Sequence, residues 1–493
     1  MLPFLSLLYL IPLAGVLILT VVPRSADRLI KVISAIVTFL PIILIVMMWG
    51  QYGGVKPDQF GMRFTEYAEW IPSFHVAYNL GVDGLGFSLV ALTALLTFLA
   101  TLASWNITNR SKEYFALLLL LEVGMMGVFM ALDYVLFYVF WELVLLPMYF
   151  LIGIWGGPRR EYAAIKFFIY TLVGSVVMLV GILALYFGTG AKTFGILEIA
   201  ALAPKVLSPV AQWWIFLALF FGFAIKVPVF PFHTWLPDAH VEAPTAISML
   251  LAGVLLKMGT YAMVRISWPT LPDAARAFTL TLLVLALINI VYGALTAMAQ
   301  KDLKKMVAYS SINHMGYFLL GLAAGTPAAL NGALYVNISH GLISALFFFA
   351  VGMMYDRTHT REMAKLGGLF LTVPVIAMAV AFVSFANLGL PGLAGFISEF
   401  FVFLGAWPAF GWLIVLAGAG LVVTAAFHLI MMRKVLMGNE LTEWKGLPDM
   451  SGREAAIFAP LLVLIVFFGL YPAPLFNLFN PAAMALAKLI GGL

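Results

Sequence analysis

The sequence contains no cysteine. Disulfide bonds, iron–sulfur ligation and thiol catalysis are therefore excluded from this chain. Charge is also scarce: Asp, Glu, Lys and Arg make up 10% of the 493 residues, against about 25% in an ordinary soluble domain. So few charged side chains cannot solvate the surface of a soluble protein. A soluble enzyme, a nucleic-acid-binding protein and a disordered chain are all excluded.

Apolar residues make up most of the sequence. They account for 63% of the chain, and the mean hydropathy is +1.06. Together these values predict an all-α, polytopic membrane protein whose main surroundings are the lipid bilayer. The first segment, residues 1–22, has no basic region and no small-residue cleavage site. We therefore expect it to be the first membrane span and not a removable signal peptide.

A membrane span needs roughly 20 mostly apolar residues, and the chain contains about fourteen such runs. They lie near residues 2–22, 29–49, 84–104, 114–132, 134–153, 166–187, 211–230, 243–265, 277–298, 304–324, 330–353, 372–404, 409–432 and 455–476. The seventh runs into Pro228 and Pro231. The twelfth is too long for one straight span and contains Asn387, Gly389 and Pro391. Both are predicted to be broken helices, which a membrane allows only where protein or a wet cavity satisfies the freed backbone groups.

The distribution of basic residues predicts the orientation of the chain. When loops are assigned to alternate sides, 18 Lys and Arg fall on one side and 7 on the other. Cytoplasmic loops are the ones enriched in Lys and Arg. The expected arrangement is therefore fourteen helices with both termini on the periplasm-like face.

The two broken helices are five spans apart, which is typical of two five-helix repeats in inverted orientation, with a pathway near the midplane at each break. We expect the repeats to comprise helices 4–8 and 9–13. The predicted organisation is residues 1–112 for helices 1–3 with an external loop, 113–270 for the first repeat, 271–435 for the second, and 436–493 for the C-terminal helix 14.

We single out seven ionisable residues within predicted spans, where each costs a few kcal/mol on insertion scales. They are Glu122, Glu142, Lys226, Lys257, His314, His340 and Glu399. One such group often only holds helices together. Seven of them, acidic and basic and spread over seven spans, favour a path for protons or ions.

Lys226 precedes Pro228, so it is expected at the C-terminal end of a half-helix whose free carbonyls can solvate an ammonium group. Glu142 is its natural partner, since its span also carries a proline, Pro147. A lysine whose proton affinity depends on a nearby carboxylate is a switchable proton site. The alternative is a static buried ion pair.

Lys257, His314 and His340 are predicted to form a lateral relay, because imidazole accepts and releases protons at small cost. Glu399 follows the second break by about two turns and is assigned to the far end of the path, toward the periplasm-like face. Its alternative role is to tie helix 12 to its neighbours. Glu122 is a secondary candidate.

Two metal-binding interpretations have less support from the sequence than the proton path. His233 and His240, with Asp238 and Glu242, lie directly after the first break, but no third ligand cluster is evident. A hydrated cytoplasmic entrance or a packed connecting loop is the preferred prediction. A haem between His314 and His340 would leave the buried lysines and carboxylates without a role. We expect no metal or cofactor in this chain.

Four segments carry a family resemblance: YVFWELVLLPMYFLIGIWGG, AIKVPVFPFHTWLPDAHVEAPTAISMLLAGVLLKMGTY, QKDLKKMVAYSSINHMGY and GLPGLAGFISEF. In this order they resemble the antiporter-like subunits of respiratory complex I, from about residue 80 to 435. The resemblance implies fourteen spans, inverted repeats and proton translocation. It matches Glu142 to the family's helix-5 glutamate, Lys226 to its helix-7 lysine and Lys257 to its helix-8 lysine. His314 and His340 match its central histidines. Glu399 matches the helix-12 position, where sister subunits usually carry lysine.

The resemblance also implies the partners. NADH, FMN, iron–sulfur clusters and quinone would be bound by other subunits, and two sister antiporter-like subunits would be neighbours in the membrane arm. A bacterial cytoplasmic membrane is the expected location. Subunits of Mrp-type Na⁺/H⁺ antiporters and of membrane-bound hydrogenases share much of the pattern and stay as alternatives. A membrane scaffold with inert charges is a third, which the seven buried ionisable groups argue against.

Overall fold

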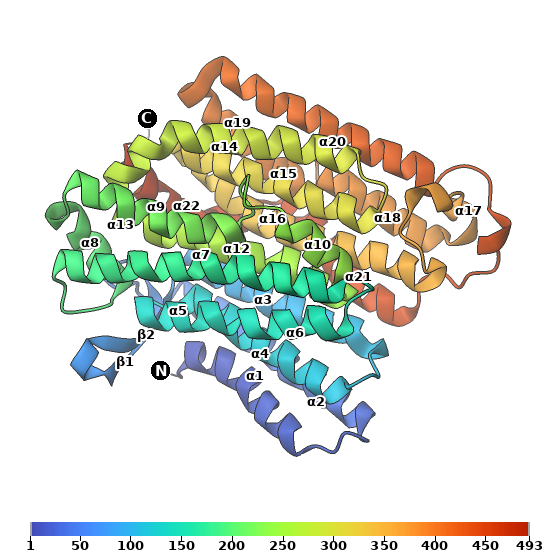
Figure 1. Ribbon diagram of the computed structural model, residues 1–493, viewed down its shortest axis with the longest axis horizontal. Coiled ribbons are helices and arrows are strands. Elements are labelled where there is room, and N and C mark those ends of the chain that lie inside the picture. The colour runs from blue at the N-terminus through green and yellow to red at the C-terminus, as the bar shows by residue number, and fades with distance from the viewer. Residues whose placement is uncertain (1, 492–493) are drawn as a thin grey trace. The chain divides into compact units, whose positions relative to one another are not determined.

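The computed structural model describes residues 2–491 and is almost entirely helical (Figure 1). Its helices are α1 (Phe4–Val21), α2 (Asp27–Tyr52), α3 (Gly84–Ala103), α4 (Ser111–Met130), α5 (Tyr134–Leu143), α6 (Leu145–Trp155), α7 (Arg160–Thr189), α8 (Ile196–Val206), α9 (Pro209–Lys226), α10 (Trp235–Glu242), α11 (Thr245–Leu250), α12 (Leu256–Ala262), α13 (Trp268–Thr270), α14 (Pro272–Met298), α15 (Leu303–Ala324), α16 (Pro327–Thr358), α17 (Leu369–Thr372), α18 (Pro374–Asn387), α19 (Ala394–Phe410), α20 (Ile414–Val435), α21 (Gly452–Leu470) and α22 (Ala473–Ile490). Two strands, β1 (Arg63–Ile71) and β2 (Val76–Val82), form the only sheet of the described residues.

Each of the fourteen predicted spans coincides with one helix or with consecutive helices. Among residues 2–491, 13 helical segments are long and apolar enough to cross a membrane. The prediction of an all-α polytopic membrane protein is therefore confirmed. Helices α8 and α22 and the two strands lie in segments that the sequence analysis treated as loops or tails.

The hairpin of β1 and β2 is antiparallel and lies beside the N-terminal end of α1 (Figure 1). Glu66 of β1 accepts hydrogen bonds from the backbone N–H groups of Leu5 (2.7 Å) and Ser6 (3.1 Å). These are among the N–H groups that a helix N-terminus leaves unsatisfied, and the helix dipole also favours an anion there. The Glu66 carboxylate thus fixes the hairpin to α1.

The described chain divides into two compact units. Unit 1 comprises residues 2–227, 254–278 and 484–491, and within it α4 packs against α1, α3, α5, α6 and α12. Unit 2 comprises residues 228–253 and 279–483, and within it α16 packs against α11, α15, α18, α19 and α21. Helix α16 is surrounded so completely that its most apolar stretch is entirely buried.

The first predicted break is present after α9. Helix α9 ends at Lys226, and residues 227–234 are not helical. The side chain of Asn289 on α14 accepts a hydrogen bond from the N–H of Phe230 (2.8 Å) and donates one to the carbonyl of Pro228 (3.2 Å). One amide side chain therefore replaces two of the backbone partners that the break removes.

The second predicted break is also present. Helix α18 ends at Asn387 and α19 begins at Ala394. Gly389 and Gly392 have φ values of +80° and +93°, in the region that glycine adopts without steric cost. A Cβ atom at Gly389 would lie 2.6 Å from Oε2 of Glu399. The connecting segment therefore runs directly against this carboxylate.

Replacing Asn289 by leucine should destabilise the chain. The change leaves the Phe230 N–H and the Pro228 carbonyl without side-chain partners, at about 1–3 kcal/mol for each buried group. The measurement is the midpoint temperature of thermal unfolding of the purified protein in detergent. Leu280→Ala, on the exposed side of the same helix, is the control. Equal losses in the two variants would show that Asn289 does not support the break.

Candidate functional site

The seven predicted site residues are distributed over both units. Unit 1 contains Glu122, Glu142, Lys226 and Lys257, whereas unit 2 contains His314, His340 and Glu399. All except Glu142 are buried, with at most 6% of the residue surface exposed.

Lys226 is the last residue of α9 and is 2% exposed. Its Nζ atom lies 5.5 Å from the ring centroid of Trp141 and 5.6 Å from that of Phe167. Both distances allow a cation–π interaction. Nζ has no hydrogen-bond partner among the described residues. A protonated Lys226 is therefore stabilised by cation–π interactions and by electrostatic attraction to a more distant charged group.

Glu142 supplies such a charge. It lies in the last turn of α5, which ends at Leu143 because Pro147 removes the hydrogen bond to that carbonyl. The carboxylate attracts the Lys226 ammonium group electrostatically, although no salt bridge joins the two in the described part of the chain. Glu142 is half-buried, and its buried Oε1 atom has no hydrogen-bond partner within residues 2–491.

Lys257 is fully buried on α12, between two π-helical turns at Leu251–Leu255 and Met263–Ser267. Such turns widen a helix locally and are frequent at functional sites. Helix α12 approaches the end of α9 closely: a Cβ at Gly259 would lie 2.8 Å from the carbonyl oxygen of Phe223. The sequence analysis did not predict the π turns.

Glu122 lies on α4, whose neighbours in unit 1 include α5, α6 and α12. The side chain is fully buried, and neither carboxylate oxygen has a hydrogen-bond partner among the described residues. An ionised carboxylate in that position would be strongly disfavoured. The position on α4 puts this secondary candidate on a helix that contacts the elements carrying Glu142 and Lys257.

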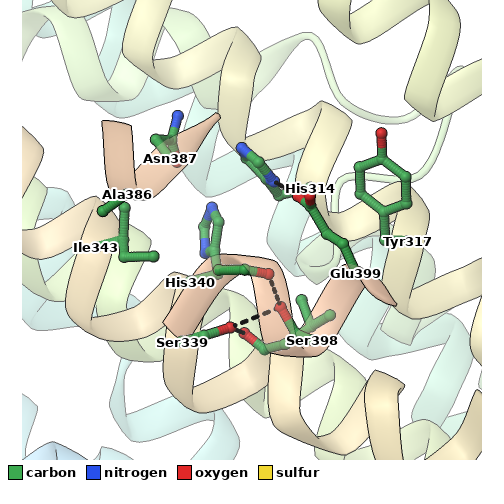
Figure 2. Close-up of a pocket in the computed structure, with 11 residues that line it drawn as sticks. His314, Tyr317, Ser339, His340, Ile343, Ala386, Asn387, Ser398 and Glu399 are labelled. Atoms are coloured by element: carbon green, nitrogen blue, oxygen red, sulfur yellow. Dashed lines mark hydrogen bonds and ion pairs between the residues drawn. The ribbon is translucent and has the colours of Figure 1, made fainter. Parts of the chain in front are cut away.

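In unit 2 the structure brings together three residues from three different helices (Figure 2). Nδ1 of His314 on α15 lies 3.1 Å from Oε1 of Glu399 on α19. The ring of His340 on α16 is 5.6 Å from that of His314, centroid to centroid. The two histidines were predicted to belong to one relay, whereas the contact between His314 and Glu399 was not predicted.

These side chains border a small internal cavity (Figure 2). Its water-accessible volume is about 10 Å³, which is close to what one ordered water needs. Ser339 donates a hydrogen bond to Ser398 across one wall (3.1 Å). Nε2 of His314 has no partner among the described residues. The cavity therefore combines the room and the polar lining that a bridging water requires.

Four polar residues that line this cavity were not predicted as site residues: Tyr317, Ser339, Asn387 and Ser398. The fully buried His428 on α20 was missed as well, and its Nε2 lies 3.0 Å from Nδ2 of Asn387. His428 occurs in the apolar run VVTAAFHLIMM. The rule that selects ionisable residues inside spans would have identified it.

The two histidines considered as metal ligands pack against aromatic side chains. Nε2 of His233 lies 3.3 Å from the Tyr292 hydroxyl, and the ring of His240 is stacked on Phe348 with a centroid distance of 4.3 Å. Within residues 2–491, no three His, Asp or Glu side chains are grouped so that they could hold a metal ion.

Comparison with known proteins identifies the family. The family model described as "NADH:quinone oxidoreductase/Mrp antiporter, TM" matches residues 131–427. The chain belongs to the NADH:quinone oxidoreductase/Mrp antiporter family. The matched region contains Glu142, Lys226, Lys257, His314, His340 and Glu399, whereas Glu122 precedes it and His428 is the first residue beyond it.

Relatives within this family cover nearly the whole chain. The chain is 43% identical to NADH-quinone oxidoreductase subunit M of Rhodobacter capsulatus, over 98% of this chain and 96% of the relative. It is 40% identical to NAD(P)H-quinone oxidoreductase chain 4 of Gloeobacter violaceus, over 99% and 93%. Among solved structures, a chain of respiratory complex I from Thermus thermophilus superposes with a TM-score of 0.90 at 31% identity, covering 99% of this chain and 100% of that one.

Gly389→Ala should impair the cavity, because the new Cβ would meet the Glu399 carboxylate and because positive φ costs a non-glycine residue roughly 1–2 kcal/mol. Gly411→Ala is a matched control: its φ is also positive, at +54°, but nothing lies within 4 Å of the added atom. Both variants should lose some stability, and only Gly389→Ala should slow proton transfer in the assembled complex. Equal proton transfer in the two variants would show that contact with Glu399 is unimportant.

Proposed function

We propose that this chain is a proton-translocating membrane-arm subunit of an NADH:quinone oxidoreductase. It couples electron transfer in other subunits to proton movement through its own buried lysine, glutamate and histidine side chains. The observation that carries the proposal is Lys226, a buried amine without a hydrogen-bond partner in the described chain, within electrostatic range of Glu142. The occupancy of such a site by a proton depends on where the carboxylate is.

The composition supports the division of work between subunits. Without cysteine this chain has no thiolate ligands for an iron–sulfur cluster, which supports placing the clusters in partner subunits. We assign NADH, FMN and quinone to partner subunits as well. Its neighbours in the membrane would be other complex I subunits, especially two sister antiporter-like subunits. We place the complex in a bacterial cytoplasmic membrane, with both termini of this chain on the periplasmic side, from the 18 to 7 division of basic residues.

The energy that the site must handle is modest. Moving one charge across a membrane costs roughly 2.3 kcal/mol per 100 mV, so a gradient of about 150–180 mV requires about 3.5–4 kcal/mol per proton. At 1.36 kcal/mol per unit, the pKa of the loading site must differ by about three units between two states. A carboxylate that approaches and withdraws in a low-dielectric site can change the pKa of its neighbour by this amount.

The remaining residues extend the path. Lys257, His314 and His340 form the lateral relay, and Glu399 is loaded and released toward the periplasmic side. The hydrogen bond between His314 and Glu399 supports the last step, since a histidine in contact with a carboxylate can pass a proton to it and take one back. A water in the adjoining cavity would extend the reach of both groups. Glu122 is a secondary site.

A Na⁺/H⁺ antiporter subunit of the Mrp type is the second candidate, because the description of the matched family includes Mrp antiporters. A membrane subunit of a membrane-bound hydrogenase is related to it. The 43% identity to a quinone oxidoreductase subunit over nearly the full length favours the first proposal. Purification of the native assembly distinguishes them: subunits that bind NADH and iron–sulfur clusters support the first.

Glu142→Gln and Lys226→Ala should each abolish or strongly reduce proton pumping while the complex still assembles, because each removes one of the two interacting charges. Pumping is measured as the pH gradient formed by vesicles during NADH oxidation. Glu161→Gln, an exposed glutamate on α7, is the matched control and should pump normally. Normal pumping by an assembled Glu142→Gln complex would disprove the proposed switch.

Glu399 can be tested by two substitutions with opposite expectations. Glu399→Gln preserves shape and hydrogen bonding but cannot ionise, so pumping should be lost. Glu399→Lys restores a titratable group of the kind that sister subunits carry, so pumping should partly recover. Full pumping by an assembled Glu399→Gln complex would show that the residue only ties α19 to its neighbours.

A further inference from the structure

The end of α18 is held by a second buried amide, Asn387, which also lines the cavity next to His314 and Glu399. Its Nδ2 atom lies 3.0 Å from Nε2 of His428 on α20 and 3.3 Å from Oγ of Ser310 on α15. Asn387 is therefore the point at which the helix break, the cavity and two neighbouring helices meet.

The hydrogen bonds of His428 determine its tautomer. Nδ1 lies 2.9 Å from the carbonyl oxygen of Thr424, which can only accept, so Nδ1 carries the proton. The imidazole is fully buried, and both of its hydrogen-bond partners are uncharged groups, so the ring is neutral. Its Nε2 is then an acceptor, and the group that faces it must be the N–H of Asn387, not the amide oxygen.

This assignment sets the direction of the Asn387 amide. With Nδ2 donating to His428 and Ser310, the amide nitrogen is turned away from the cavity, and Figure 2 shows it directed away from the ring of His340. The carbonyl oxygen of the same amide then faces the cavity side. The cavity consequently receives a fixed hydrogen-bond acceptor in addition to the Glu399 carboxylate.

His428 itself is poorly suited to carry a proton. Both ring nitrogens are occupied, and the ring is stacked against Phe347 and lies against Phe427, at centroid distances of 5.7 and 4.2 Å. Taking up a proton would convert Nε2 into a donor that faces another donor. The ring therefore acts through Asn387 and has no direct access to the cavity.

We propose that His428 is a positioning residue for the proton site of unit 2: by accepting a hydrogen bond from Asn387, it fixes the amide that presents an acceptor oxygen to the His314–Glu399 cavity. This proposal rests on the proposed function of that cavity. The acceptor orients the cavity water, and the water aligns proton transfer between the histidines and Glu399.

Three variants separate the two hydrogen bonds of the ring. His428→Gln places an amide oxygen near the position of Nε2 and preserves the acceptor. His428→Asn replaces only the Nδ1 side, so it preserves the bond to Thr424 and loses the bond to Asn387. His428→Phe preserves the aromatic packing and loses both. Proton pumping is measured in vesicles and divided by the amount of assembled complex, so that differences in assembly do not affect the comparison.

His428→Gln should pump like the unsubstituted complex, whereas His428→Asn and His428→Phe should lose roughly three- to tenfold, as expected for one buried hydrogen bond. His428→Asn combined with Asn387→Ala should be no worse than Asn387→Ala alone, because both changes remove the same interaction. Equal pumping by the Gln and Asn variants, or additive losses in the double variant, would overturn the proposal.

Glu399→Gln in the same vesicles separates this inference from the proposed function. Loss of pumping in Glu399→Gln together with normal pumping in His428→Asn would reject the positioning role alone. Normal pumping in both would reject the proton site itself.

Discussion

Inside a bilayer, a backbone amide or carbonyl that leaves its helix finds no water to replace the lost partner, at a cost of several kcal/mol. The two broken helices of this chain exist under that constraint. Asn289 bonds two backbone groups of the first break, and Asn387 ends the helix at the second while its own amide is held by Ser310 and His428. Lys226 is the last residue before the first break, and Glu399 lies against Gly389 of the second, so two of the ionisable residues lie at segments that buried amide side chains support.

The two units stabilise their buried ionisable side chains in different ways. In unit 1 the Lys226 amine lies near two aromatic rings, has no hydrogen-bond partner among the described residues, and is attracted electrostatically by Glu142. In unit 2 the Glu399 carboxylate has a direct partner in His314 and a cavity large enough for about one water. A loosely held amine suits a site whose proton occupancy changes, and a hydrogen-bonded histidine–glutamate pair suits transfer from one group to the next.

Much of this arrangement could be predicted, because the physical rules for membrane segments act on sequence composition. Runs of about 20 apolar residues locate spans, and prolines and glycines within them locate breaks. The same rules missed the β1–β2 hairpin, whose strands carry no long apolar run, and α22, which follows α21 after only two residues. They also missed the π turns around Lys257, since a π turn leaves no compositional signal.

The sequence by itself determined the class of protein, the positions of both breaks and seven ionisable residues that need a reason to be buried, because each of these follows from the cost of placing polar groups in lipid. Tertiary structure alone decided which of them meet. His314 and Glu399 are 85 residues apart and on different helices, and only the packing of α15, α16 and α19 brings them to one cavity. The role of His428 is likewise set by contacts with Asn387 and Thr424, because hydrogen-bond direction depends on which atoms face each other in space.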